Sequence, residues 1–272
     1  MTLKDKVVLI TGASRGIGRA IALRCARDGA KLALAGRSES PHPQLPGTLG
    51  EVVREAEALG GRALACPMDV RSEAAVEAAV AKAASVFGGI DALVANAGAL
   101  SLRGTERTSA ARFDLLFGTN VRGAFLCMRA CLKRLKTSAS PRVLAIAPPP
   151  SLDPRWLAPH LPYTLSKYGM SLSVIGWAEE FRSLGIAVSA LWPRTTIATS
   201  AMNLLGGEAA VRTARKPEIV AEAAREILLM PPAACTGRFF LDEDVLRERG
   251  VTDFSAYSVD PSEEPAKDLF VE

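Results

Sequence analysis

Short apolar runs alternate with amphipathic segments along most of the chain. The apolar runs are rich in Val, Ile, Leu and Ala, as in buried strands of a parallel sheet, and they predict strands over 7–11, 31–35, 62–68, 90–95, 142–147, 187–192 and 237–241. Between them, hydrophobic residues recur with helical spacing, which predicts helices over 18–28, 51–59, 72–87, 109–135, 163–184 and 218–230. Strands separated by helices indicate a parallel sheet with right-handed crossovers and helices on both faces.

The same pattern predicts one continuous domain. Nothing between residues 1 and 242 has the composition of a linker, and no internal repeat is present. We expect residues 1–242 to form this α/β domain. Residues 243–272 are expected to add a short helix and a tail that packs on the same domain.

Composition removes several classes of protein. The chain has 33 basic and 29 acidic side chains, a net charge of +4, so nucleic acid is not an expected partner. Its five cysteines are too scattered for a disulfide framework, and no pair has metal-site spacing, so no metal is expected. No apolar stretch approaches the roughly 20 residues of a membrane span, and no signal segment is visible. We therefore expect a cytoplasmic protein.

Three glycines follow the first predicted strand, where the chain turns into a helix. Gly12, Gly16 and Gly18 allow a pyrophosphate to approach backbone N–H groups and the positive end of the helix. This predicts a Rossmann-type, doubly wound single domain whose turn binds a dinucleotide through Gly12, Ser14, Arg15, Gly16, Ile17 and Gly18. The glycine spacing differs from the usual fingerprint, so an ordinary tight turn is the alternative.

The end of the second strand selects the cofactor in such folds. A carboxylate there accepts from a ribose 2′-hydroxyl, whereas a basic side chain pairs with a 2′-phosphate. Here the residues are Gly36, Arg37 and Ser38, and Arg15 adds a second guanidinium nearby. We predict NADP(H) as the cofactor, because a guanidinium binds phosphate with paired, charge-assisted hydrogen bonds. The alternative is two solvated surface arginines.

Tyr163 and Lys167 lie one helical turn apart and project from one face of a predicted helix. A free tyrosine has a pKa near ~10, and a neighbouring ammonium is expected to lower it. Such a tyrosine could exchange a proton with a carbonyl or an alcohol while hydride moves at the adjacent carbon. A half-buried tyrosine beside a surface lysine is the alternative.

Taken together, these motifs resemble the short-chain dehydrogenases/reductases over residues 5 to about 242. The resemblance is carried by five motifs in the family's order: the glycine turn, an aspartate after the third strand, an Asn-Ala-Gly segment after the fourth, an asparagine in the long helix, and the Tyr-x-x-x-Lys pair. In this chain they are Gly12, Gly16 and Gly18; Asp69; Asn96, Ala97 and Gly98; Asn120; and Tyr163 with Lys167.

The resemblance implies a role for each position. Tyr163 would be the general acid/base, Lys167 would hold the nicotinamide ribose, and Asn120 would bend its helix and position a relay water. The remaining cofactor contacts would come from Asp69 and Val70 at the adenine, Asn96, Ala97 and Gly98 near the ribose, and Pro193 and Thr196, with Thr195 and Thr199, by the nicotinamide. The family also implies a substrate lid near 204–207. A homodimer or homotetramer is expected, formed by the helices that carry Asn120 and Tyr163.

One family position departs from the pattern. The serine that normally orients the substrate carbonyl is absent, because the fifth strand ends in Ala147 and three prolines, and Ser151 is the nearest hydroxyl. We therefore carry two hypotheses. The first is an NADP(H)-dependent oxidoreductase that interconverts a carbonyl and a primary or secondary alcohol on an apolar or lipid-like substrate. The alternative is a nucleotide-binding redox sensor or scaffold with weak or lost catalysis.

Overall fold

A seven-stranded parallel sheet forms the centre of the molecule in this computed structural model, which describes residues 2–40 and 45–272. The strand order is β3-β2-β1-β4-β5-β6-β7. The strands are β1 (Val7–Thr11), β2 (Lys31–Gly36), β3 (Arg62–Pro67), β4 (Ala92–Ala95), β5 (Arg142–Ile146), β6 (Ala187–Trp192) and β7 (Phe239–Leu241). The order reverses between β1 and β4, so the predicted doubly wound, Rossmann-type α/β fold is confirmed.

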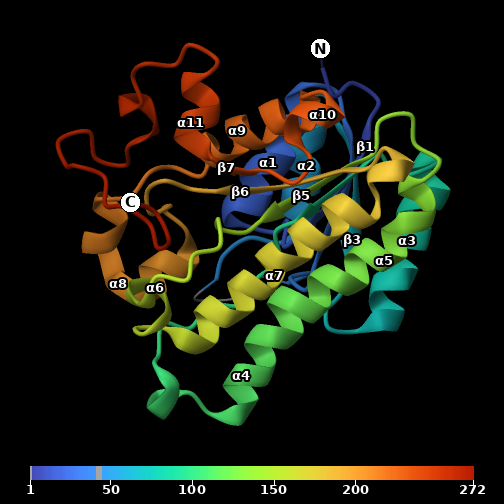
Figure 1. The fold of residues 1–272 in the computed structure, drawn as a ribbon. Helices are drawn as coiled ribbons and strands as arrows, with labels where there is room; N and C mark the ends of the chain where they lie inside the picture. The colour runs from blue at the N-terminus through green and yellow to red at the C-terminus, as the bar shows by residue number, and fades with distance from the viewer. Residues whose placement is uncertain (1, 41–44) are drawn as a thin grey trace.

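Helices cover both faces of the sheet (Figure 1). One face carries α1 (Gly16–Arg27), α2 (Leu49–Ala58), α9 (Glu218–Leu229) and α11 (Asp242–Arg247). The other carries α3 (Glu73–Phe87), α5 (Gly123–Leu135) and α7 (Leu161–Glu180), and α4 (Ala110–Phe117) contacts α7. Each face buries its own apolar cluster, and β1, β4, β5 and β6 are buried along their whole length. This explains why those strands are almost continuously apolar.

Most element boundaries lie within two residues of the prediction. Thr48 and Glu51 form a capping box, so α2 begins at Leu49 rather than at 51, and Ser72 caps α3 as expected. The predicted helix over 109–135 is interrupted by one π-helical turn, η2 (Gly118–Arg122). Residues 41–44 of the predicted loop lie outside the described residues.

The sequence prediction missed three helices: α6 (Pro154–Leu157), α8 (Ser200–Arg212) and α10 (Pro232–Cys235). Two of them are only four residues long, too short for a periodic pattern. α8 buries none of its residues and carries no apolar stripe, and its chain breaks at Gly207 (φ 65°, ψ −164°). A helix without a buried face leaves no periodic signal to detect.

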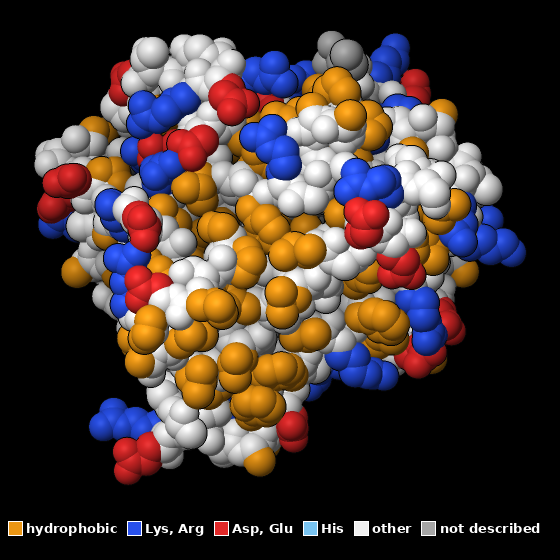
Figure 2. All heavy atoms as spheres, in the orientation of Figure 1, with side chains coloured by type: hydrophobic (Ala, Val, Ile, Leu, Met, Phe, Trp, Pro, Cys, Tyr) orange, Lys and Arg blue, Asp and Glu red, His pale blue; other side chains and the backbone are white. Residues whose placement is uncertain are grey.

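Large apolar side chains gather on the face made by α4, α5 and α7 (Figure 2). The most exposed are Leu172 (61%), Phe125 (49%) and Ile175 (47%). This apolar face is unusual for surface helices, whose outer sides are normally polar. Among the described helices, none is long and apolar enough to cross a membrane.

Candidate active site

The carboxyl ends of β1 and β4 are held together by one threonine and one asparagine. The Thr11 hydroxyl accepts from the backbone N–H groups of Asn96 and Ala97, each at 3.0 Å, and donates to the Val94 carbonyl at 3.3 Å. The Asn96 amide donates to the carbonyls of Thr11 at 2.9 Å and Gly12 at 3.3 Å. Asn96 therefore fixes the glycine turn, and Thr11 is a positioning residue that the sequence analysis missed.

Between β1 and α1, the turn has room for backbone only. Gly12 and Gly16 have φ of +68° and +54°, a conformation that glycine adopts without strain. A Cβ on Gly18 would lie 2.4 Å from the Gly12 carbonyl oxygen, and one on Gly12 would lie 2.9 Å from the Asn96 amide nitrogen. The turn leads directly into α1, a twelve-residue helix. A bare turn at a helix N-terminus fits a pyrophosphate.

Two arginines lie at the ends of β1 and β2. The Arg15 guanidinium donates to the Ser38 hydroxyl at 2.6 Å and the Gly47 carbonyl at 3.1 Å, and its Nε is buried without a partner. Burial and the nearby charge of Arg37 both lower the pKa of Arg15. Within the described ranges neither arginine forms an ion pair, although the charge of Arg37 contributes to lowering the pKa of Asp69. This pair fits a 2′-phosphate.

Asp69 and Val70 follow β3 and point to different surroundings. The Asp69 carboxylate pairs with Arg71 at 2.6 Å, and this hydrogen-bonded pairing lowers its pKa. Val70 is buried against α5, since a Cβ on Gly123 would lie 2.8 Å from its Cγ2. Val70 thus anchors the segment in the core and leaves Asp69 at the sheet edge.

Lys167 is buried on α7 with 6% of its surface exposed. Its ammonium donates to the Ile146 carbonyl at 2.8 Å and lies 5.0 Å from the centre of the Trp192 ring. The segment after β4 also approaches it, because a Cβ on Gly98 would lie 3.9 Å from Nζ. Burial lowers the pKa of Lys167 to about 8, partly opposed by the nearby Asp268 carboxylate.

Tyr163 is equally buried, at 6% exposure, and its pKa is raised by burial first and by Asp268 second. This direction is opposite to the one expected from its lysine neighbour, because desolvation of the phenolate dominates. The phenol is therefore neutral at neutral pH. A neutral phenol can donate a proton to an acceptor oxygen.

Asn120 lies in the π-helical turn η2 and is completely buried. Its Oδ1 accepts from the Ala99 N–H at 2.7 Å, and its Nδ2 donates to the Ala99 carbonyl at 3.0 Å and the Ser166 hydroxyl at 2.9 Å. Ser166 in turn donates to the Tyr163 carbonyl at 2.8 Å. The asparagine side chain thus connects the segment after β4 to the first turns of α7, and both its N–H groups are used in doing so.

The proline segment after β5 is tied to α7 by Ser171, whose hydroxyl donates to the Pro148 carbonyl at 2.6 Å. Ser151 accepts from the Asp153 N–H at 3.1 Å, just before α6 begins. This hydrogen bond gives Ser151 a local role in the turn. Its role as a substitute for the missing serine stays a prediction.

The segment after β6 meets the C-terminal residues of the chain. Pro193 is buried, and the hydroxyls of Thr195 and Thr196 are buried without partners among the described residues. The Thr196 N–H donates to the Ala266 carbonyl at 2.9 Å. The tail had not been predicted to reach the site, because its sequence carries no motif. The unpaired hydroxyls fit a polar group such as a carboxamide.

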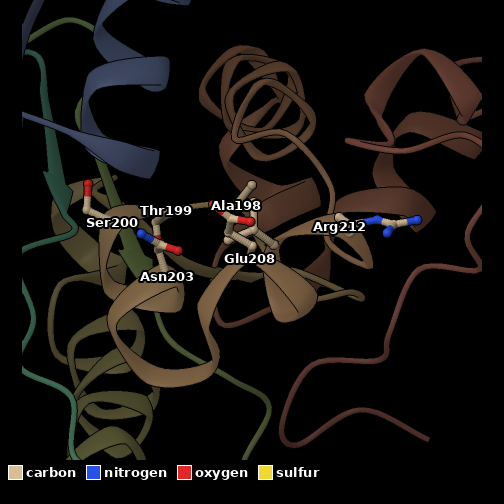
Figure 3. Close-up of a pocket in the computed structure, with 7 residues that line it drawn as sticks. Ala198, Thr199, Ser200, Asn203, Glu208 and Arg212 are labelled. Atoms are coloured by element: carbon tan, nitrogen blue, oxygen red, sulfur yellow. The ribbon is translucent and has the colours of Figure 1, made fainter.

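Thr199 caps α8 by accepting from the Met202 N–H at 3.2 Å, and it packs against Gly16, whose Cβ would lie 3.1 Å away. The two halves of α8 enclose a hollow of about 530 Å³. Figure 3 shows Thr199 and Asn203 beside this hollow, while Arg212 extends away from it toward its ion pairs. Of the residues predicted for the site, only Thr199 lines it. The kink at Gly207 lies within the predicted lid region.

Comparisons with known proteins identify the family. A sequence model described as short chain dehydrogenase matches residues 6–208. Hydroxysteroid dehydrogenase-like protein 2 from Homo sapiens is 47% identical over 265 residues, covering 97% of this chain. The chain spans only 63% of the length of that relative. The same identity and coverage are found for the protein of that name from Danio rerio.

Solved structures agree with the sequence comparisons. A dehydrogenase from Xanthomonas campestris has a TM-score of 0.96 and 50% identity, with all of both chains covered. A short chain dehydrogenase from Burkholderia cenocepacia in complex with NADP has a TM-score of 0.74 and 26% identity, covering 89% of this chain and 97% of its own. The chain therefore belongs to the short-chain dehydrogenase family of NAD(P)-dependent oxidoreductases.

Proposed function

We propose that the protein is an NADP(H)-dependent oxidoreductase that interconverts a carbonyl and a primary or secondary alcohol on an apolar or lipid-like substrate. The observation that carries the proposal is the burial of Tyr163 and Lys167 on one face of α7, tied through Ser166 to Asn120. Burying a phenol and an ammonium costs stability. A scaffold protein has no physical reason to keep this arrangement.

The preference for NADP(H) is supported by the two unpaired arginines. Arg15 and Arg37 would hold the 2′-phosphate, the glycine turn would hold the pyrophosphate, and Lys167 would hold the nicotinamide ribose. Pro193 and Thr196 would contact the nicotinamide end of the cofactor, where the buried Thr196 hydroxyl has no hydrogen-bond partner among the described residues. When bound, the nicotinamide would supply hydride to the carbonyl carbon in reduction, or accept it from the hydroxyl-bearing carbon of the alcohol in oxidation.

The residues of the chain would move the proton. In reduction, the Tyr163 hydroxyl donates its proton to the carbonyl oxygen of the substrate, and in oxidation the phenolate takes a proton from the alcohol. Lys167, one turn further along the same helix, would contribute a positive charge that stabilises the phenolate as it forms. Carbonyl reduction is the proposed direction, because it starts from the neutral phenol, the form that burial of Tyr163 favours.

A substitution that removes only the phenol oxygen of Tyr163 tests this proposal. Tyr163→Phe removes the hydroxyl, and we expect turnover of a carbonyl panel with NADPH to fall by at least about a hundredfold, the usual contribution of a general acid. NADPH affinity should stay within twofold. Tyr257→Phe is the control, because it removes the same hydroxyl from a tyrosine of the C-terminal region whose ring packs on Phe254. Turnover that survives Tyr163→Phe would refute the proton transfer.

The second hypothesis, a redox sensor or scaffold with weak catalysis, rests on the replacement of the family serine by Ala147 and the prolines. The same experiment separates the two. NADPH binding without any carbonyl turnover above the Tyr163→Phe background would favour the sensor.

A second copy of the chain is the proposed partner of the apolar face on α4, α5 and α7. Leu172, Phe125 and Ile175 would be covered in a homodimer or homotetramer. Leu172→Glu should lower the mass measured by sedimentation if this face pairs. The five cysteines are free, buried thiols, which is compatible with the cytoplasm as the proposed location.

A further inference from the structure

The last residues of the chain run along the segment that follows β6. The Asp268 N–H donates to the Arg194 carbonyl at 3.1 Å, and the Leu269 carbonyl accepts from the Trp192 indole at 2.8 Å. Thr195 and Lys267 form an antiparallel bridge. These backbone contacts fix residues 266–269 beside the end of β6, where the nicotinamide end of the cofactor site was predicted.

Phe270 is held at the centre of an aromatic cluster. Its ring centre lies 6.3 Å from that of Tyr163, with the two planes 30° apart, and 5.3 Å from that of Tyr168. Trp192 and Trp156 complete the cluster at 5.9 and 6.0 Å. Only 6% of Phe270 is exposed. The tail thus places a large apolar side chain directly beside the catalytic phenol.

The backbone of Phe270 shows that this position is strongly constrained. Its φ is +68°, in the left-handed region that an aromatic residue rarely adopts. Such a conformation is strained and persists only where the surroundings overdetermine it. The ring contacts and the flanking hydrogen bonds supply that constraint, and Glu272 adds an ion pair with Arg155 of α6.

Asp268 brings a carboxylate to the same place. It raises the pKa of Tyr163 and opposes the lowering of the pKa of Lys167, so it lies within electrostatic reach of both. The tail therefore affects the chemistry of the site through a charge as well as through a ring. A terminal segment that merely covered the core would place neither group against the catalytic pair.

We propose that residues 266–271 form a wall of the substrate site, in which Phe270 limits the size of the apolar carbonyl compound that reaches Tyr163. The inference rests on the proposed function of Tyr163 as proton donor. A substrate carbonyl within hydrogen-bond reach of the Tyr163 hydroxyl must lie close to a ring that stacks beside it. Phe270 is buried among Trp156, Tyr168 and Trp192, so its ring fills space beside Tyr163 that is lined by aromatic side chains. The substrate class is therefore apolar and of limited size.

Binding of two ketones of different size tests the wall. The full chain saturated with NADP+, which prevents reduction, is titrated by calorimetry with 2-butanone and with 2-acetylnaphthalene. In Phe270→Ala we expect the affinity for 2-acetylnaphthalene to rise at least about tenfold over the wild type, since a large side chain is removed from the wall. The affinity for 2-butanone should change less than twofold, and Phe270→Leu should give an intermediate gain.

Phe254→Ala is the matched control. Phe254 is a phenylalanine of the same burial, 6% exposed, in the same C-terminal region, but its ring packs on Tyr257. It should bind both ketones as the wild type does. Equal affinity of the wild type and Phe270→Ala for 2-acetylnaphthalene would overturn the proposal, as would the same gain in Phe254→Ala.

The readout separates this inference from the function it rests on. Because no turnover is measured, a proton donor other than Tyr163 would leave the size selectivity intact and would appear only in the Tyr163→Phe kinetics. A tenfold loss of NADP+ affinity in Phe270→Ala, without any gain for the larger ketone, would assign the tail to the cofactor and overturn the substrate wall.

Discussion

Replacing Arg37 by alanine should change which cofactor the protein prefers. Arg15 already donates hydrogen bonds to Ser38 and Gly47. Its positive charge lies near that of Arg37, and within the described chain Arg15 pairs with no carboxylate. A 2′-phosphate carries a charge of about −1.5 to −2 at neutral pH and would relieve this repulsion. NADH has no such group. The loss of Arg37 should therefore affect NADPH alone.

The magnitude follows from the exposure of Arg37. A hydrogen bond to a charged group contributes about 1.5–3 kcal/mol, and the exposed position of Arg37 places it toward the lower end of that range. Since about 1.4 kcal/mol corresponds to a tenfold change in Kd, the Kd for NADPH should rise roughly tenfold to fiftyfold. The Kd for NADH should change less than twofold.

Titration of nicotinamide fluorescence with each cofactor measures both constants. Arg182→Ala is the control for net charge, because Arg182 is exposed at the end of α7 and pairs with Glu179, far along the chain from the glycine turn. It should leave both constants unchanged. Equal weakening of NADPH and NADH by Arg37→Ala, or an unchanged NADPH constant, would refute the 2′-phosphate site. In Arg37→Ala, the Kd for NADPH should also depend less on salt concentration than it does in the wild type.

Three further predictions follow from the described contacts. Gly18→Ala should lower the free energy of unfolding in urea by about 1–3 kcal/mol, because its Cβ would lie 2.4 Å from the Gly12 carbonyl oxygen. Gly176→Ala should instead raise it by about 0.5–1 kcal/mol, because this Cβ would meet open space on α7. Asn120→Ala removes three buried hydrogen bonds, so urea unfolding should show a loss of about 2–4 kcal/mol, and a loss below 0.5 kcal/mol would contradict the bridging role. Carbonyl reduction should fall no more than about twofold from pH 6 to 8, because burial keeps Tyr163 protonated and Lys167, with a pKa of about 8, is only half deprotonated at the upper limit. Alcohol oxidation should accelerate as the pH rises, and a reduction rate that falls tenfold over this range would exclude Tyr163 as the donor.

The sheet could be predicted because its signal is local. β6 was predicted at its observed bounds, since six consecutive buried residues produce one apolar run. The glycine turn was found for a related reason: Gly12 and Gly18 occupy positions where any side chain would collide with backbone or with Asn96. In both cases the residues that carry the pattern are neighbours in the sequence, even where the group that constrains them, such as Asn96, is distant.

The pKa of Tyr163 could not be predicted in the same way. The i, i+4 spacing correctly indicated that Lys167 shares its helix face, but the direction of the pKa shift depends on burial by other elements and on Asp268, which is 105 positions further along the chain. Phe270 was missed for the same reason. Long-range packing assigns these residues to the site, and neither periodicity nor a short motif records it.

Three buried ionisable side chains, Asp242, Asp268 and Lys167, lower the free energy of unfolding when they are charged. Burial raises the pKa of Asp242 to about 6 and that of Asp268 to about 7, and it lowers the pKa of Lys167 to about 8. For an acid whose folded pKa is raised, stability is lost as the pH rises through that value. For a lysine whose folded pKa is lowered, the penalty is present below it and disappears as the pH rises further. All three penalties therefore overlap near pH 7 to 8.

An edge of the sheet shaped for stability alone would carry apolar groups here, and perturbed groups of this kind concentrate at functional sites. The charges of Asp268 and Lys167 act on one another at this edge, which supports the proposal that the tail takes part in the site.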